Sequence, residues 1–209
     1  MRVGVLLYEG VDLLDAGGPY EVFLTASRLA VRDGADPPFD VVTVTPTGEP
    51  VAAYGGLGLA PEAGMADCGR LDVLIVPGTV DVDAATADKA LVDAIDQLAN
   101  ASGLTASVCT GAFLLADAGL LDGRPWTTHW EDVDLLARRL GPDRAVRDVR
   151  WVDAGAVVTA AGLSSGIAMG LHLVDRLVGR QLAERTARQL DYAWQPDASA
   201  AAPSASPTG

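Results

Sequence analysis

Short apolar runs alternate with amphipathic stretches along most of this chain. The nearly continuous apolar runs at 3–8 and 71–76 are typical of strands that are covered on both faces. The alternating, β-branched segment 39–45 and the small, apolar segment 104–108 predict two further strands. Glycine turns predict two hairpins, one at 50–60 and one at 149–160.

Apolar positions spaced for one helical face fill most of the intervals between these strands. They predict helices over 13–29, 83–100, 110–118, 130–140, 162–178 and 181–192. Strands that alternate with helices favour an α/β fold, in which a mostly parallel sheet carries helices on both faces. We expect one such domain over 1–196, followed by a disordered Ser/Ala/Pro-rich tail over 197–209.

The composition excludes several classes of function. The formal net charge is −13, and a surface this acidic repels nucleic acid and anionic membranes. No apolar run reaches the roughly 20 residues that span a bilayer, and no basic leader precedes the first strand. Two cysteines are too few for a disulfide framework, and no Cys/His cluster has metal-ligand spacing. We therefore expect a cytoplasmic protein with no metal, nucleic-acid or membrane partner.

Cys109 is the strongest candidate for chemistry. It follows a buried strand directly and precedes a helix, so its side chain should reach the carboxyl edge of the sheet, where ligands of open α/β folds bind. A helix N-terminus would also favour the nucleophilic thiolate by lowering the pKa of the thiol. The competing interpretation is a small buried hydrophobe. That interpretation suits Cys68 better, because Cys68 lies in a loop with no helix behind it.

Asp15 is the second candidate, since it follows the first strand and should emerge at the same sheet edge as Cys109. A carboxyl group there could share a proton with the thiol or deliver one to an intermediate. An acid in the first turn of a helix can instead satisfy free amides. Asp12 fits that capping role better and leaves Asp15 for another.

Weaker signals surround these two residues. Pro77-Gly78-Thr79 ends a central strand, and the amides of such a turn could cradle a developing negative charge, although many strand ends carry Pro-Gly only to turn. His129 follows two threonines and could neighbour the thiol, or could simply be packed beside Trp130. His172 lies within a predicted helix and is expected to be structural.

The segments GVLLYEGVDLLDAGGPYEVF, LDVLIVPG, SVCTGAFLLADAGLLDGRPWTTHW and AAGLSSGIAMGLHLV occur in this order along the chain. Together they resemble the ThiJ/PfpI superfamily, and within it the isonitrile hydratase branch and the amidotransferase-like sensor domains of AraC-type regulators. The resemblance extends to about residue 195. It implies a flavodoxin-like three-layer sandwich and a homodimer.

The resemblance also implies roles for single residues. Cys109 matches the reactive cysteine, Thr110 the residue after it that faces the pocket, and Asp15 the acid that hydrogen-bonds the cysteine. Two departures matter. Pro77-Gly78-Thr79 stands where isonitrile hydratases usually carry Pro-Gly-Gly, so the anion pocket could differ. Thr110 stands where the protease-like branch has His, which weakens a peptidase interpretation.

The resulting hypothesis is hydration of an isonitrile, a small-molecule substrate, to an N-substituted formamide without a cofactor. Cys109 would attack the terminal carbon, Asp15 would move the proton, and water would release the product. Gly78, Thr79, Thr110 and His129 are the expected substrate-binding residues. Two alternatives stay open: a non-enzymatic ligand or redox sensor that uses Cys109, and an aldehyde-handling, glyoxalase-like enzyme with His129 as proton shuttle.

Overall fold

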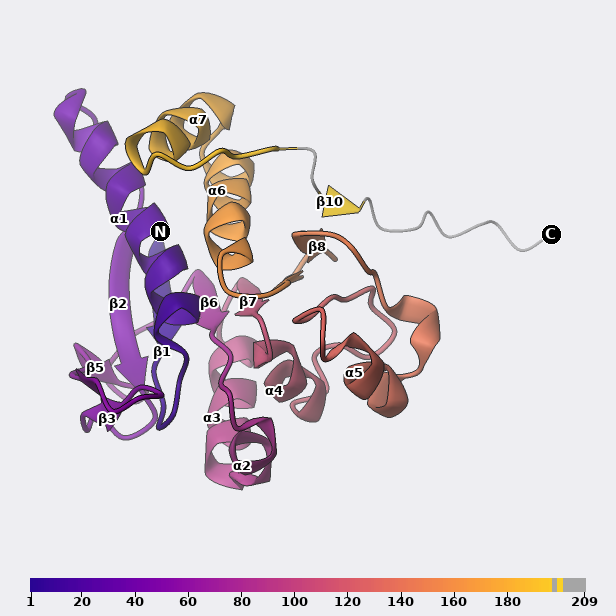
Figure 1. The fold of residues 1–209 in the computed structure, drawn as a ribbon. Coiled ribbons are helices and arrows are strands. Elements are labelled where there is room, and N and C mark those ends of the chain that lie inside the picture. Colours follow the sequence, from indigo (N-terminus) through magenta and orange to yellow (C-terminus); the bar gives the residue numbers. More distant parts are fainter. Residues whose placement is uncertain (197–198, 201–209) are drawn as a thin grey trace.

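The computed structural model describes residues 1–196 and 199–200, and an eight-stranded sheet lies at its centre (Figure 1). The strand order is β10-β8-β9-β7-β6-β1-β2-β5. All pairs are parallel except β8 with β9. The strands are β1 (Arg2–Leu6), β2 (Asp40–Thr45), β5 (Ala63–Gly64), β6 (Val73–Val76), β7 (Leu104–Val108), β8 (Trp151–Asp153), β9 (Val157–Ala160) and β10 (Ser199–Ala200).

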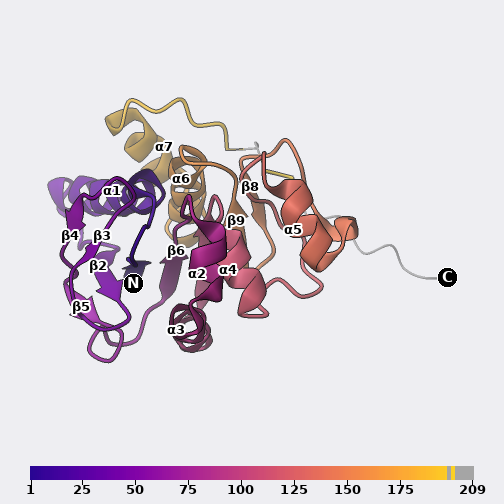
Figure 2. The same cartoon turned by 60° about the horizontal axis from the view of Figure 1, so that its bottom comes forward.

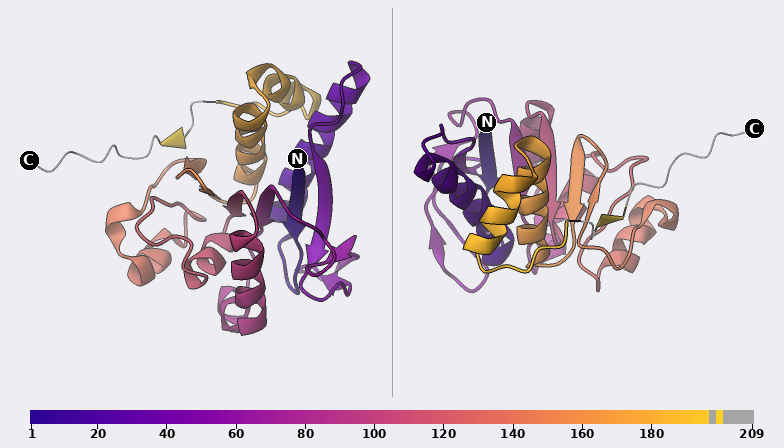
Figure 3. Two further views of the ribbon diagram at one scale, coloured as in Figure 1. Left: turned by 180° about the vertical axis from the view of Figure 1, so that it is seen from behind. Right: turned by 90° about the horizontal axis from the view of Figure 1, so that it is seen from above.

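Helices cover both faces of the sheet and complete the predicted three-layer α/β fold (Figure 2). One layer packs together α1 (Leu13–Arg32), α6 (Ser165–Leu177) and α7 (Arg180–Gln189). The other holds α2 (Val82–Ala87), α3 (Lys89–Asn100) and α4 (Gly111–Asp117), while α5 (Val133–Leu140) and the short 3-10 turn η1 (Pro142–Arg144) lie beside the β8–β9 end of the sheet. Seen from above in Figure 3, α1, α6 and α7 lie across the strands.

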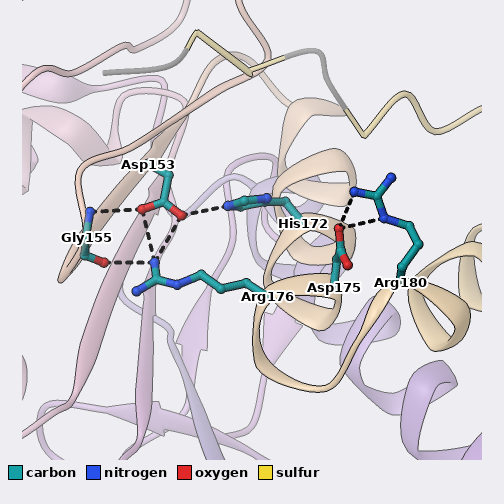
Figure 4. A network of polar contacts seen from close by, with 6 residues as sticks. All are labelled: Asp153, Gly155, His172, Asp175, Arg176 and Arg180. Carbon is teal, nitrogen blue, oxygen red and sulfur yellow. Dashed lines mark hydrogen bonds and ion pairs between the residues drawn. The ribbon is translucent and has the colours of Figure 1, made fainter. Parts of the chain in front are cut away.

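Both predicted hairpins are confirmed. The first pairs β3 (Val51–Ala52) with β4 (Gly58–Leu59), and the second pairs β8 with β9, both antiparallel. A polar network joins the second hairpin to the helices (Figure 4). Asp153 lies 2.7 Å from His172 Nε2 and accepts hydrogen bonds from Arg176, while Asp175 of α6 pairs with Arg180 of α7. The contacts of Asp153 hold the hairpin against α6, and the Asp175–Arg180 pair joins α6 to α7.

The helix predicted over 83–100 is wrong in one respect, because it is two helices. Asp88 adopts an extended conformation between α2 and α3, and its side chain accepts hydrogen bonds from the amides of Ala90 and Leu91. Asp is a strong N-cap, so a new helix begins where the amphipathic pattern alone suggested continuity.

Three further segments differ from the prediction. Helix α5 begins at Val133 rather than near Trp130. Ser199 and Ala200 pair with β8, within the segment predicted to be a disordered tail. The rest of that segment, 197–198 and 201–209, lies outside the described residues. Strand β5 was not predicted, since two residues leave no readable pattern.

The sheet has a switch point between β1 and β6. The chain leaves β1 through α1 to β2 on one side, whereas β6 and β7 extend the sheet on the other. Ligands of open α/β sheets bind at the carboxyl ends of strands where the order reverses in this way. Within the described residues, no helix is both long enough and apolar enough to cross a bilayer.

Candidate active site

Three strand ends meet at the switch point and bring the two predicted reactive groups together. Asp15 follows β1, Gly78 follows β6 and Cys109 follows β7. Because these strands are parallel neighbours, their carboxyl ends share one edge of the sheet. The sequence prediction that Asp15 and Cys109 emerge at the same edge is therefore confirmed.

Cys109 occupies a sharp turn between β7 and α4. Its φ angle is +57°, a left-handed conformation that non-glycine residues rarely adopt. The surrounding main chain holds it there: the Cys109 amide donates to the carbonyls of Ala160 and Ala161 at 3.1 and 2.9 Å, and Thr128 Oγ1 donates to the Cys109 carbonyl at 2.8 Å. Backbone strain of this kind persists only where neighbouring contacts enforce it, and it clusters at functional sites.

Gly111 allows β6 to approach this turn. A Cβ atom at Gly111 would lie 2.4 Å from the Val76 carbonyl oxygen and 2.9 Å from that of Pro77. Real Cβ atoms are not found so close to backbone, so the turn needs glycine here. The glycine of the Cys-Thr-Gly sequence after β7 is thus explained by close packing of two strand ends.

Asp15 is fully buried beneath the turn. Its Oδ2 accepts a hydrogen bond from the Gly78 amide at 3.1 Å, while Oδ1 has no hydrogen-bond partner among the described residues. Asp12, by contrast, caps α1 by accepting from the Leu14 amide at 3.0 Å, as predicted. Asp15 is therefore free of the ordinary capping role.

The pKa of the Cys109 thiol is shifted in the direction opposite to the prediction. Burial first, and the Asp15 carboxylate second, raise the pKa of Cys109 to about 12, although hydrogen bonds from the amides of Thr110 and Leu163 act to lower it. The net shift is therefore opposite to the lowered pKa expected for a thiol at a helix N-terminus. The Thr110 amide at the start of α4 does act in the expected direction, but desolvation of the thiolate outweighs it.

The pKa of Asp15 is raised to about 7, chiefly by burial and then by the charge of Asp12. The Gly78 amide and the Cys109 thiol act to lower it. Asp15 and Cys109 thus lie close enough for each to influence the other's pKa, although no hydrogen bond of good geometry joins them. A carboxyl group with a pKa near 7 can accept or donate a proton at physiological pH.

The turn at Pro77-Gly78-Thr79 positions side chains. The Gly78 amide donates to Asp15, and the Thr79 amide donates to Thr110 Oγ1 at 2.8 Å, while that hydroxyl donates to the Thr79 carbonyl at 2.7 Å. Because both amides are already engaged, the predicted cradle for a developing negative charge is not available at this turn. A Cβ atom at Gly78 would lie 2.8 Å from Asp15 Oδ2, so glycine is needed here as well.

A cavity of about 320 Å³ opens above Cys109. Thr79, Thr110 and His129, three of the four residues predicted to bind substrate, line it, whereas Gly78 does not. Sequence reasoning missed the remaining lining residues, which are Asp12, Val80, Val82, Glu131, Asp132 and Leu163. They come from separate loops and helix starts, so no sequence pattern links them.

Two supporting residues were also missed. Thr128 holds the Cys109 carbonyl, as described above, and the buried Tyr8 hydroxyl donates to the Pro77 carbonyl at 2.8 Å. Burial, Asp15 and Cys109 raise the pKa of Tyr8, in that order, which places its ring near the pair. The only sequence signal for either residue was a polar group in an otherwise buried segment.

The other cysteine and the other histidine lie away from the cavity. Cys68 is buried, unpaired and hydrogen-bonded through its thiol to the carbonyls of Met65 and Gly69. His172 stacks on Trp151 with ring centroids 5.2 Å apart. Across the described residues, no group of three His, Cys, Asp or Glu side chains is arranged to hold a metal ion.

Several known proteins are similar to this chain in sequence, in fold or in both. Isonitrile hydratase of Pseudomonas putida is 35% identical over 212 residues, which cover 100% of this chain and 86% of that protein. The HTH-type transcriptional regulator GbdR of Pseudomonas aeruginosa is 29% identical over 91% of this chain but only 50% of its own length. A ThiJ/PfpI family protein from Pseudomonas syringae has a TM-score of 0.79 at 28% identity, covering 94% of this chain and 76% of that one.

A protein-family model also matches the part of the chain that forms the candidate site. The DJ-1/PfpI family model matches residues 1–176, a span that contains the strand ends carrying Asp15, Gly78 and Cys109 as well as the loops around the cavity. From this match, the chain belongs to the DJ-1/PfpI family.

Proposed function

We propose that this protein hydrates isonitriles to N-substituted formamides, using Cys109 as nucleophile and Asp15 as the group that moves the proton. One observation carries the proposal: a cysteine in a left-handed turn faces a cavity, and a buried carboxyl with a pKa of about 7 lies beneath it. Similarity to an isonitrile hydratase along the full chain supports this choice of substrate.

The two pKa values decide the order of proton transfer. With a pKa of about 12, Cys109 rests as a thiol near pH 7, while Asp15 is substantially ionised there. Asp15 therefore acts first as a general base that takes the thiol proton as the sulfur attacks. The amides of Thr110 and Leu163, which favour the ionised sulfur, stabilise the charge that develops on it.

The chemistry then balances as a net addition of water. The sulfur bonds to the terminal isonitrile carbon, and Asp15 returns the proton to that carbon to give a thioimidate. Water adds its oxygen to the same carbon and a proton to nitrogen. The carbon–sulfur bond breaks, the sulfur regains a proton from the new hydroxyl group, and the N-substituted formamide leaves. No electrons are gained or lost, so the chemistry requires no redox cofactor.

The test follows formamide formation from several neutral alkyl and aryl isonitriles. Wild type should show turnover, while Cys109→Ala should show none above background and Asp15→Asn should lose most of its kcat. Cys68→Ala is the matched control and should keep its activity, because Cys68 lies outside the cavity. Equal rates in wild type and Cys109→Ala across the series would refute the proposal.

The similarity to transcriptional regulators makes a sensor role the second candidate function. The isonitrile experiment also tests this role. Reversible binding of an isonitrile without turnover would favour a ligand sensor. A redox sensor is less well supported, since thiol oxidation follows thiolate character and exposure, and Cys109 is 9% exposed with a raised pKa. An aldehyde-handling role would require that the protein consume a 2-oxoaldehyde and that His129→Ala lower the rate of this reaction.

We further propose a cytoplasmic homodimer. Two unpaired cysteines suit a reducing compartment. An apolar hollow of about 260 Å³ between α1 and the β4 segment, together with the half-exposed side chains of Leu13 and Leu14, offers a face that a second copy could cover. Sedimentation should give twice the 21.5 kDa chain mass. A single species at the chain mass would refute the dimer.

A further inference from the structure

The mouth of the Cys109 cavity carries an unbalanced negative charge. Asp12, Glu131 and Asp132 all line it, and no Arg or Lys is present among its described lining residues. His129 is the one lining side chain that can become cationic. Asp15 adds a further carboxyl group beneath the sulfur. A molecule entering the cavity therefore meets carboxylates on the way to Cys109.

Two of these carboxylates, Glu131 and Asp132, face the imidazole of His129. Asp132 stands at the N-cap of α5 but makes no side-chain capping hydrogen bond. Its Oδ2 lies 3.4 Å from His129 Nδ1, and Glu131 Oε2 lies 3.9 Å from the same atom, with 62% of the Glu131 side chain exposed. Neither has an Arg or Lys partner among the described ion pairs. Two carboxylates thus face one imidazole, so this part of the cavity wall carries a net negative charge.

Another part of the wall is apolar. Val80, Val82 and Leu163 line the same cavity, and Val80 and Leu163 remain 58% and 38% exposed. Large apolar side chains exposed together at the edge of a cavity mark a place where an apolar group can be covered. The cavity thus combines an apolar wall, suited to a hydrocarbon substituent, with a field that opposes anions.

We propose that the cavity selects its substrate by charge: it admits neutral and cationic molecules with an apolar substituent and rejects anionic ones, through Glu131 and Asp132. For isonitriles, this choice of substrate class rests on the proposed function. Clefts lined by one sign of charge concentrate ligands of the opposite sign and repel those of the same sign.

The first experiment tests charge selection without requiring hydratase activity. Cys109 is labelled with three methanethiosulfonates: the neutral methyl reagent, the anionic 2-sulfonatoethyl reagent and the cationic 2-(trimethylammonium)ethyl reagent. Each forms a mixed disulfide with the sulfur and releases methanesulfinate. Peptide mass spectrometry gives the rate at Cys109 separately from Cys68. The cation-to-anion rate ratio should exceed that of free 2-mercaptoethanol by about ten-fold or more.

Matched variants assign the effect to the proposed residues. Glu131→Gln and Asp132→Asn should each move the ratio toward that of 2-mercaptoethanol. Asp93→Asn removes the same charge from an exposed position on α3, which does not line the cavity, and should leave the ratio unchanged. Higher ionic strength should also reduce the ratio, because salt screens exposed charges.

The second experiment uses isonitriles that differ in charge. Methyl isocyanoacetate is neutral, and isocyanoacetate is its anionic counterpart. The neutral ester should have a kcat/KM about ten-fold or more above that of the anion, and the ester-to-anion ratio should fall in Glu131→Gln and Asp132→Asn. Asp93→Asn should keep the wild-type ratio.

The two experiments separate the two proposals. If charge-dependent labelling follows the Glu131 and Asp132 variants while no isonitrile is hydrated, the charge selection stands and the proposed function fails. If the labelling ratio equals that of 2-mercaptoethanol, or if Asp93→Asn changes it as much as Asp132→Asn does, the charge selection is overturned. That result would hold whether or not isonitriles are hydrated.

Discussion

Cys109 and Asp15 act as one titrating pair, since each lies in the field of the other. Between pH values of about 7 and about 12 the pair holds one proton, which rests on the sulfur. In the proposed reaction, attack on a substrate requires that this proton move to Asp15. In the proposed mechanism, attack therefore depends on proton transfer within the pair, and the ionisation of Asp15 sets the fraction of reactive protein.

The expected pH dependence follows from that control. Because Asp15 must be ionised to accept the thiol proton, kcat/KM for a neutral isonitrile should rise with pH and level off above a midpoint of about 7. Below the midpoint the rate should fall about ten-fold per pH unit. Initial rates across this range measure it, with Cys68→Ala as the control. A midpoint near the ordinary carboxyl value, or a flat profile, would contradict the assignment of Asp15.

At the scale of elements, the turn between β7 and α4 is held from outside by Thr128. This threonine reaches across from the segment after α4 and donates to the Cys109 carbonyl. The strained φ of Cys109 has to be enforced by such contacts, because its own backbone preference opposes it. The segment around Thr127 and Thr128 is buried, so it forms a fixed support for the turn.

Replacing this support should affect both stability and activity. Thr128→Val leaves the buried Cys109 carbonyl without its donor and should lower the free energy of unfolding by about 1–3 kcal/mol. It should also lower kcat, because the turn is less well held. Urea denaturation and steady-state kinetics measure the two effects. Thr86→Val, which removes a half-buried hydroxyl bonded to the Val82 carbonyl of its own helix, is the control. Equal losses in both variants would count against a special role for Thr128.

The elements themselves were largely readable from the sequence, whereas the cavity was not. Strands buried on both faces, such as β7, leave continuous apolar runs, and Cys109 was placed correctly because strand and helix patterns meet there. The break at Asp88 was missed since one capping side chain can end a helix that the periodicity continues. The loops that supply Val80, Asp132 and Leu163 meet only in the folded chain, so no local pattern announces them.

At the scale of the whole molecule, the site lowers the stability of the fold. A fully buried carboxyl with one unpaired oxygen binds a proton more tightly in the folded chain than in the unfolded chain. Stability then decreases as pH rises from the ordinary Asp value toward about 7, because the folded state is the one that must give up the proton at higher pH. The fold tolerates this cost through the extensive apolar core on both faces of the sheet.

Removing the charge should therefore stabilise the protein while it removes most of the proposed activity. Asp15→Asn should be more stable than wild type above pH 7, by at most about 4 kcal/mol, and the difference should shrink as pH approaches about 4. Denaturant unfolding at several pH values measures it. Asp93→Asn is the control, because its carboxyl is exposed on α3. A variant that is less stable than wild type at high pH would show that Asp15 is a structural residue.

The contacts that fix Cys109 and the side chains that line the cavity are largely different, and this separation bears on how the protein can be re-engineered. The orientation of Cys109 is fixed by hydrogen bonds to Ala160, Ala161 and Thr128 and by glycine packing against β6. Much of the surface that a ligand meets comes from side chains outside this turn, including Val80, Val82, Glu131 and Asp132. Substituting Val80, Val82, Glu131 and Asp132 should change which ligands are accepted while leaving the reacting atoms undisturbed, so diversity libraries are best confined to these four positions.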